Sequence, residues 1–108
     1  MDESTAIRIA EKLKPRYPDA QMVHTGGGFV NVFWTDLVDD ELRSYVLGDS
    51  NGPFEVDTYK GDYLNDDDAL YLWPYEFDED LTEDEVVEAL TRDDSQNNAP
   101  GTIATLEP

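Results

Sequence analysis

The sequence contains no cysteine. This absence excludes disulfide scaffolds, cysteine-based zinc sites, iron–sulfur clusters and thiol nucleophiles. The chain also has no apolar run near the roughly 18 residues that a membrane-spanning helix needs. Its first residues, Met-Asp-Glu-Ser, are acidic, whereas a signal peptide begins with basic residues. We therefore expect a soluble cytoplasmic protein that does not enter a membrane.

Basic residues are scarce, because the 108 residues include only 7 Lys and Arg against 26 Asp and Glu, for a formal net charge of -19. The hydrophobic share of 39% allows one modest core but not two. The last residues mix Ser, Gln, Asn, Pro and Gly without periodicity, which is typical of disorder. We expect one α+β domain over residues 1–92 and a disordered C-terminal tail over residues 93–108.

The negative charge is concentrated in one part of the chain. Residues 1–36 carry five acidic and four basic residues, so this third is almost neutral. Residues 57–94 carry fifteen acidic residues against Lys60 and Arg92, a net charge of -13. Such a region repels nucleic acid and anionic membranes and attracts cationic partners. We therefore expect no direct nucleic-acid binding; the alternative is an acidic surface that only keeps the protein soluble.

Hydrophobic spacing predicts a helix at the start of the chain. The helix begins at a cap provided by Ser4 or Thr5 and ends before Pro15. Its buried stripe follows the spacing of one helical face and comprises Ala6, Ile9, Ala10 and Leu13. A second helix is predicted from Thr82, because Thr82 and Glu85 form a capping box.

Between the helices, runs of β-branched and aromatic residues predict strands at 21–25, 29–35, 43–48, 54–59 and 69–73. We expect residues 36–42 to form a turn and the last strand to be an edge strand that ends at Pro74. The order helix, four or five antiparallel strands, helix predicts an α+β fold. In this fold a β-meander has the N-terminal and C-terminal helices packed on one face, and the other face is partly exposed.

The sequence does not predict an enzyme. His24 is the only histidine, and no serine has the sequence surroundings of a nucleophile. The glycines at 26–28 precede a predicted strand, whereas a phosphate-binding loop opens a helix. Asp66 to Asp68 do not fit the EF-hand spacing, although weak binding of calcium by this acidic loop is left open. We predict no catalytic residues, no metal site and no cofactor.

Large aromatic residues alternate with acidic ones between Asp57 and Glu88. Aromatic rings provide desolvated anchors in protein interfaces, and carboxylates provide charge complementarity and fast association. Tyr71 and Trp73 fit a core position equally well. The predicted partner-binding set is Asp57, Asp62, Tyr63, Asp66, Asp67, Asp68, Tyr75, Glu76, Asp78, Glu79 and Asp80.

These features lead to the hypothesis of a small acidic DNA-mimic inhibitor. Duplex DNA carries about one charge per 1.7 Å, so a net charge of -13 matches about 22 Å of duplex. In charge and length the chain resembles the DNA mimics that phages carry against host defences, such as anti-restriction and anti-CRISPR proteins; no sequence motif carries this resemblance. The expected partner is a basic protein surface, such as the nucleic-acid groove of a nuclease or defence effector, in the host cytoplasm if a phage encodes the chain.

Two other functions stay open at this point. An immunity protein that neutralises a nuclease toxin would need the same acidic surface. A salt-adapted, halophilic domain with an unrelated role would also be acidic, since Asp outnumbers Glu by 16 to 10; the near-neutral first third argues against it. An exposed edge strand also makes a homodimer possible.

Overall fold

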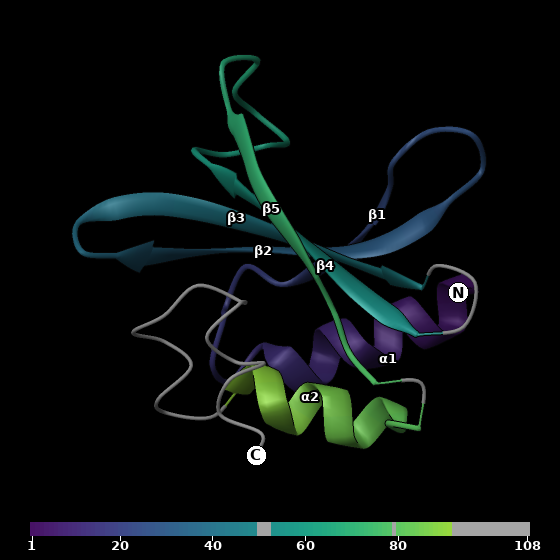
Figure 1. Ribbon diagram of the computed structural model, residues 1–108. Helices are drawn as coiled ribbons and strands as arrows, with labels where there is room; N and C mark the ends of the chain where they lie inside the picture. Colours follow the sequence, from purple (N-terminus) through teal and green to yellow (C-terminus); the bar gives the residue numbers. More distant parts are fainter. Residues whose placement is uncertain (50–52, 79, 92–108) are drawn as a thin grey trace.

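The computed structural model describes residues 1–49, 53–78 and 80–91. The elements follow in the order α1 (Glu3–Leu13), β1 (Gln21–His24), β2 (Val30–Val38), β3 (Glu41–Asp49), β4 (Phe54–Lys60), β5 (Leu70–Glu76) and α2 (Glu83–Thr91) (Figure 1). The five strands form one antiparallel sheet in the order β1-β2-β3-β4-β5. This confirms the predicted α+β meander with two terminal helices.

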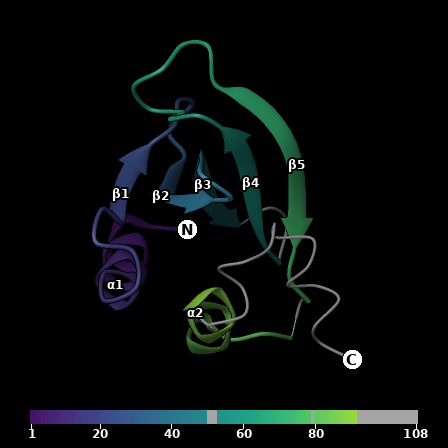
Figure 2. The same cartoon turned by 90° about the vertical axis from the view of Figure 1, so that its left-hand side faces the viewer.

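Both helices lie on one side of the sheet, which arches over them (Figure 2). We call the side of the sheet that faces away from α1 and α2 the open face. The main core lies on the helix side and combines residues of both helices with alternate residues of the strands. A smaller cluster of Val23, Phe33 and Val46, with Tyr59 packed against it, lies on the open face.

The first helix begins two or three residues earlier than expected. Its N-cap is Asp2, whose carboxylate accepts a hydrogen bond from the Thr5 backbone N–H at 2.8 Å. The expected caps, Ser4 and Thr5, therefore lie inside the helix. The expected stripe of Ala6, Ile9, Ala10 and Leu13 is buried, as its spacing predicts.

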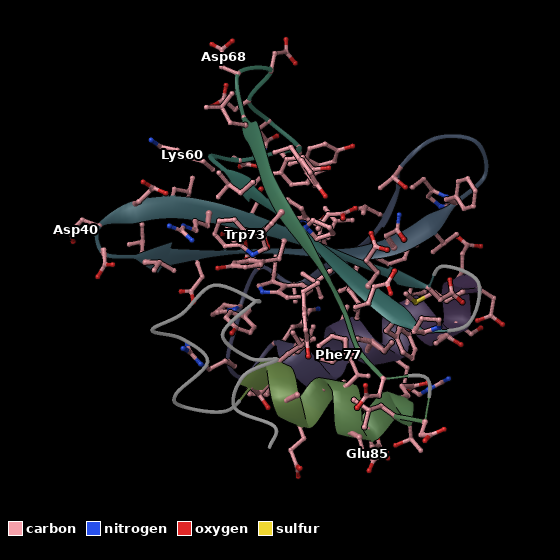
Figure 3. All side chains as sticks on the ribbon, in the orientation of Figure 1. Asp40, Lys60, Asp68, Trp73, Phe77 and Glu85 are labelled. Atoms are coloured by element: carbon pink, nitrogen blue, oxygen red, sulfur yellow. The ribbon has the colours of Figure 1, made fainter. Side chains whose placement is uncertain are left out.

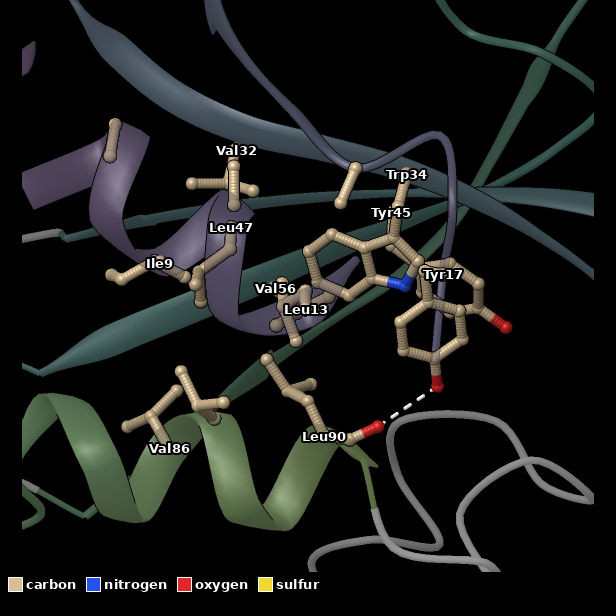
Figure 4. Close-up of a cluster of buried hydrophobic side chains, with 14 of the residues drawn as sticks. Ile9, Leu13, Tyr17, Val32, Trp34, Tyr45, Leu47, Val56, Val86 and Leu90 are labelled. Carbon is tan, nitrogen blue, oxygen red and sulfur yellow. Dashed lines mark hydrogen bonds between the residues drawn. The ribbon is translucent and has the colours of Figure 1, made fainter. Parts of the chain in front are cut away.

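The second helix has the capping box that the sequence predicts. Thr82 donates its backbone N–H to Glu85 Oε1 at 2.8 Å, and Glu85 donates its backbone N–H to Thr82 Oγ1 at 3.2 Å. The far end of α2 is joined to the core by Tyr17, whose hydroxyl donates to the carbonyl of Leu90 at 2.9 Å (Figure 4). In the same core the Trp34 ring stacks between Tyr17 and Tyr45, with centroid distances of 5.6 and 5.5 Å.

The prediction of a turn over residues 36–42 is wrong for most of these residues. β2 and β3 continue through it and pair up to Val38 and Glu41, so only Asp39 and Asp40 form the turn. Both residues have positive φ, 54° and 68°. A two-residue hairpin turn with this geometry normally contains glycine. Because glycine is absent from this turn, the sequence does not predict a turn of only two residues.

The last strand runs through Pro74 instead of ending there. Proline is tolerated at this place because β5 is an edge strand, where one side of the backbone needs no partner. The register between β4 and β5 shifts near Thr58, which pairs with Trp73, while the next residue, Tyr59, pairs with Tyr71. Leu72 is therefore an extra residue, and this bulge turns Tyr71 and Trp73 to opposite sides of the sheet.

No helix in the described part of the chain is both long and apolar enough to span a membrane. The tail predicted at 93–108 lies outside the described residues. The boundary at residue 92 stays a prediction.

Candidate functional site

Two basic residues of α1 form ion pairs with acidic residues of α2. Arg8 Nε on α1 lies 2.8 Å from Glu83 Oε1 on α2, and Lys12 Nζ contacts both Glu83, at 3.4 Å, and Asp84. The hydrogen bond from Arg8 and the nearby charges lower the pKa of Glu83. Hydrogen bonding from Lys12 likewise lowers the pKa of Asp84. The acidic start of α2 is therefore part of the contact between the two helices.

Two further cations lie at the far end of the sheet. Arg43 Nε lies 3.1 Å from Glu41 Oε2, and Lys60 Nζ lies 3.7 Å from Glu41 Oε1. Lys14 pairs with Glu11 on α1 at 3.0 Å. These cations are used by acidic residues outside the predicted partner-binding set.

The acidic residues of that set have a different environment. Within residues 1–49, 53–78 and 80–91, no Lys or Arg lies within 4.0 Å of their carboxylates. These acidic residues are Asp57, Asp62, Asp66, Asp67, Asp68, Glu76, Asp78 and Asp80. Their negative charge is thus left for solvent, counterions or a partner.

The first group of these acids lies in the loop of residues 61–69, which joins β4 to β5. Asp62 Oδ1 accepts from the backbone N–H of Leu64 at 3.1 Å, and Asp66 Oδ1 accepts from that of Asp68 at 2.9 Å. These bonds are local turns that shape the loop. Asp67 and Asp68 are exposed, and Asp68 lies at the outer end of the molecule in Figure 3.

Tyr63 fixes this loop to the sheet. Its backbone N–H donates to Ser44 Oγ on β3 at 3.1 Å, and its ring stacks on Tyr59 of β4 with a centroid distance of 4.3 Å. Tyr59 also meets Tyr71 of β5 edge-on at 5.5 Å. The three tyrosines form a continuous cluster on the open face, in which Tyr63 is 37% exposed and Tyr71 is 53% exposed.

A second group of acids lies beside the tyrosines on the same face. Asp57 follows Glu55 two residues along β4, and Glu55 pairs directly with Glu76 on β5. Burial raises the pKa of Asp57 to about 6, and the neighbouring Glu55 contributes to the same shift. Desolvation, followed by the charges of Asp57 and Glu55, raises the pKa of Tyr71, so the exposed ring and the carboxylates share one electrostatic environment.

The remaining predicted residues are separated from this face. Tyr75 is half-buried on the helix side, where its ring packs edge-on against Phe77 at 4.9 Å. Asp78 and Asp80 are exposed between β5 and α2. Glu79 lies outside the described residues. Acidic residues therefore lie near both ends of β5, on the open face and before α2. The seven residues of β5 span about 20 Å.

The predicted set omitted Glu55 and Tyr71. The alternation of Glu55, Asp57 and Tyr59 is a period-two signal that places these residues on one face of a strand. Tyr71 gives no such signal, because its side depends on the bulge at Leu72. We define the acidic tyrosine face as Glu55, Asp57, Tyr59, Tyr63, Tyr71 and Glu76.

His24 and the glycines at 26–28 lie outside the acidic tyrosine face. His24 Nε2 lies 3.3 Å from Glu3 on α1, where both side chains are exposed. The glycines at 26–28 all have positive φ and connect β1 to β2, so they form a hairpin turn as expected. Among the described residues, no group of three His, Cys, Asp or Glu side chains is arranged to hold a metal ion. In comparisons with known proteins, no family model, no curated protein and no solved structure matches this chain.

Proposed function

We propose that the protein is an inhibitory binding protein that imitates DNA toward a basic nucleic-acid-binding protein. The observation that carries this proposal is the separation of charges. Cations pair with acids on α1, α2 and β3, whereas within the described ranges no Lys or Arg lies within 4.0 Å of the carboxylates of Glu76 or of the loop between β4 and β5. A surface of this kind attracts a positively charged groove over long range.

The dimensions agree with this function. The acids on the loop and those before α2 lie at opposite ends of β5, about 20 Å apart along the strand. Duplex DNA presents about a dozen phosphates over the same length. In the proposed complex, the carboxylates take the positions of phosphates and exclude the nucleic acid from the groove.

The proposed partner is a nuclease or another defence effector that acts on DNA in the cytoplasm. The acidic surface disfavours direct binding of nucleic acid and of anionic membranes, because like charges repel. The proposal therefore requires competition for the partner and no contact between the chain and the DNA.

A competition assay tests the proposal. Fluorescent duplex DNA is bound to each member of a panel of restriction endonucleases, CRISPR effectors and nuclease toxins, and the chain is titrated in. We expect release of DNA from the target class, and we expect this release to weaken steeply as salt rises from about 50 to about 200 mM. Release only from nuclease toxins would favour an immunity protein instead.

A matched pair of variants tests whether the acidic loop of residues 61–69 controls association with the partner. In the variant Asp66→Asn, Asp67→Asn, Asp68→Asn, three charges are removed while the side-chain oxygens that form the turns are kept. The control Asp39→Asn, Asp40→Asn, Glu88→Gln removes three exposed charges elsewhere. We expect several-fold slower association for the first variant only. Equal association rates for both variants, or no DNA release from any panel member, would contradict the proposal.

A further inference from the structure

In the part of the chain that the structure describes, no helix covers the acidic tyrosine face. The helices cover the opposite side (Figure 2), and in the loop of residues 61–69 Tyr63 contacts this face by donating to Ser44 and by stacking on Tyr59. The exposed ring of Tyr71 lies on the edge strand, next to the stacked pair of Tyr59 and Tyr63. An exposed aromatic surface of this kind indicates a binding site for a partner.

The face combines aromatic rings with carboxylates, and an arginine side chain can bind to both at once. The rings of Tyr63 and Tyr71 offer electron-rich faces to a cation. Asp57 and Glu76 offer carboxylate oxygens on the same side of the sheet. A guanidinium group stacks flat on a ring and donates in-plane hydrogen bonds to a carboxylate, whereas an ammonium group is a strongly hydrated point charge.

The molecule already contains this arrangement on the other side of β5. The guanidinium of Arg43 lies over the ring of Trp73, 5.3 Å from its centroid, while its Nε lies 3.1 Å from Glu41. The guanidinium of Arg16 also lies over a ring, 5.0 Å from the centroid of Tyr17. Stacking of arginine on an aromatic ring is thus a contact that this chain itself uses.

Two carboxylates of the acidic tyrosine face have no cationic partner in the part of the chain that the structure describes. Within residues 1–49, 53–78 and 80–91, no Lys or Arg forms an ion pair with Asp57 or Glu76. A second copy of the chain is a poor occupant, because two chains with a net charge of -19 repel each other. Charge complementarity therefore selects a cationic partner.

We propose that the acidic tyrosine face binds an arginine-bearing segment of the partner, with an arginine side chain stacked on Tyr71 or Tyr63 and bonded to the carboxylates beside it. This proposal rests on the proposed function, since it names the chemistry of the partner at the same surface. It adds a selectivity for arginine over lysine, which charge imitation alone does not provide.

Short peptides test this selectivity without the natural partner. Binding of octa-arginine and octa-lysine to the full chain is measured by calorimetry at the same ionic strength. We expect octa-arginine to bind about two- to fivefold more tightly, the range for cation–π contacts at exposed sites. We also expect the Tyr63 and Tyr71 ring signals in NMR spectra to shift with octa-arginine and to shift less with octa-lysine.

Three variants assign the preference to the face. Tyr71→Ala should lower the arginine-to-lysine ratio toward one, and Tyr71→Phe should keep it, because the ring is retained. Phe29→Ala removes a ring that is 68% exposed at the hairpin of β1 and β2, and it should leave the ratio unchanged. Circular dichroism melting confirms that each variant is folded.

The proposal is overturned if the wild-type chain binds both peptides equally, or if Tyr71→Ala and Phe29→Ala change the ratio to the same extent. It is also overturned if sedimentation shows a dimer that loses peptide binding as it forms. The peptide assay contains no nucleic acid and no nuclease. An arginine preference without DNA release in the panel assay would therefore remove the proposed function and leave this face as an arginine-binding surface.

Discussion

Glu55 on β4 and Glu76 on β5 lie directly opposite each other on the open face of the sheet, with Asp57 two residues from Glu55. Like charges placed opposite each other across a strand pair destabilise the sheet. The repulsion is reduced when one carboxyl holds a proton, and Asp57 is the group whose pKa is raised, to about 6. The acidic tyrosine face thus weakens the fold at neutral pH.

The first prediction is a gain in stability on mild acidification. The pKa of Asp57 is higher in the folded state than the ordinary value of 3.8, so the folded state holds more protons between about pH 4 and about pH 6. The stability from this group is present below pH 4 and is lost as the pH rises through 6. We expect the free energy of unfolding to be larger at about pH 5 than at about pH 7 by about 1 kcal/mol, allowing for solvent screening.

Urea unfolding of Asp57→Asn at the two pH values provides the comparison, since this variant should lose most of the difference. Asp67→Asn, which removes an exposed charge in the loop, should keep it. A wild-type protein that is less stable at the lower pH would show that Asp57 does not control this range.

The second prediction concerns the start of α2. Thr82→Ala removes the side-chain acceptor of the Glu85 N–H and should lower the free energy of unfolding by about 1 kcal/mol. Thr82→Ser keeps the hydroxyl and should restore most of the loss. Thermal melting of the three proteins measures the effect; equal melting temperatures for the alanine and serine variants would show that the hydroxyl contributes nothing.

The third prediction concerns the turn between β2 and β3. Asp40 has a φ of 68°, which glycine adopts without the steric strain of a Cβ atom. Asp40→Gly should therefore increase the free energy of unfolding by about 0.5 to 1 kcal/mol. Asp40→Asn removes the same charge but keeps the Cβ atom, so the difference between the two variants in urea unfolding isolates the backbone effect. A glycine variant no more stable than the asparagine variant would contradict it.

The fourth prediction concerns the buried hydrogen bond between the Tyr17 hydroxyl and the Leu90 carbonyl. Tyr17→Phe removes the donor and leaves the ring stacked on Trp34, so the free energy of unfolding should fall by about 1 kcal/mol. Tyr71→Phe, at an exposed ring, should change stability much less. Denaturant unfolding of both variants tests the contrast, and similar losses in the two would refute it.

The sequence predicted those parts of the fold that depend on neighbouring residues. The Thr82 and Glu85 capping box and the buried stripe of α1 were predicted correctly, because their patterns lie within two helical turns. The N-cap of α1 was predicted wrongly, because Asp2, Ser4 and Thr5 lie within four residues of one another and each is a good cap. The extent of β2 and β3 was missed because the turn of Asp39 and Asp40 lacks glycine.

Less of the candidate site could be predicted from the sequence, because the site depends on strand register. In a regular strand, Tyr71, Trp73 and Tyr75 would all face one way. The bulge leaves Trp73 and Tyr75 on the helix side and places Tyr71 with Tyr59 on the open face. No local pattern in the sequence marks this shift, so the face on which Tyr71 lies could not be predicted.

The bulge at Leu72 also bears on how such a surface can change over time. Loss of the Leu72 codon would make Tyr71 adjacent to Trp73, so the regular pleat would keep Tyr71 opposite Tyr59 on the open face. A deletion at the bulge can therefore make the edge strand regular without removing the exposed ring. Among related chains, one with a β5 shorter by this residue would still present the tyrosine at the surface.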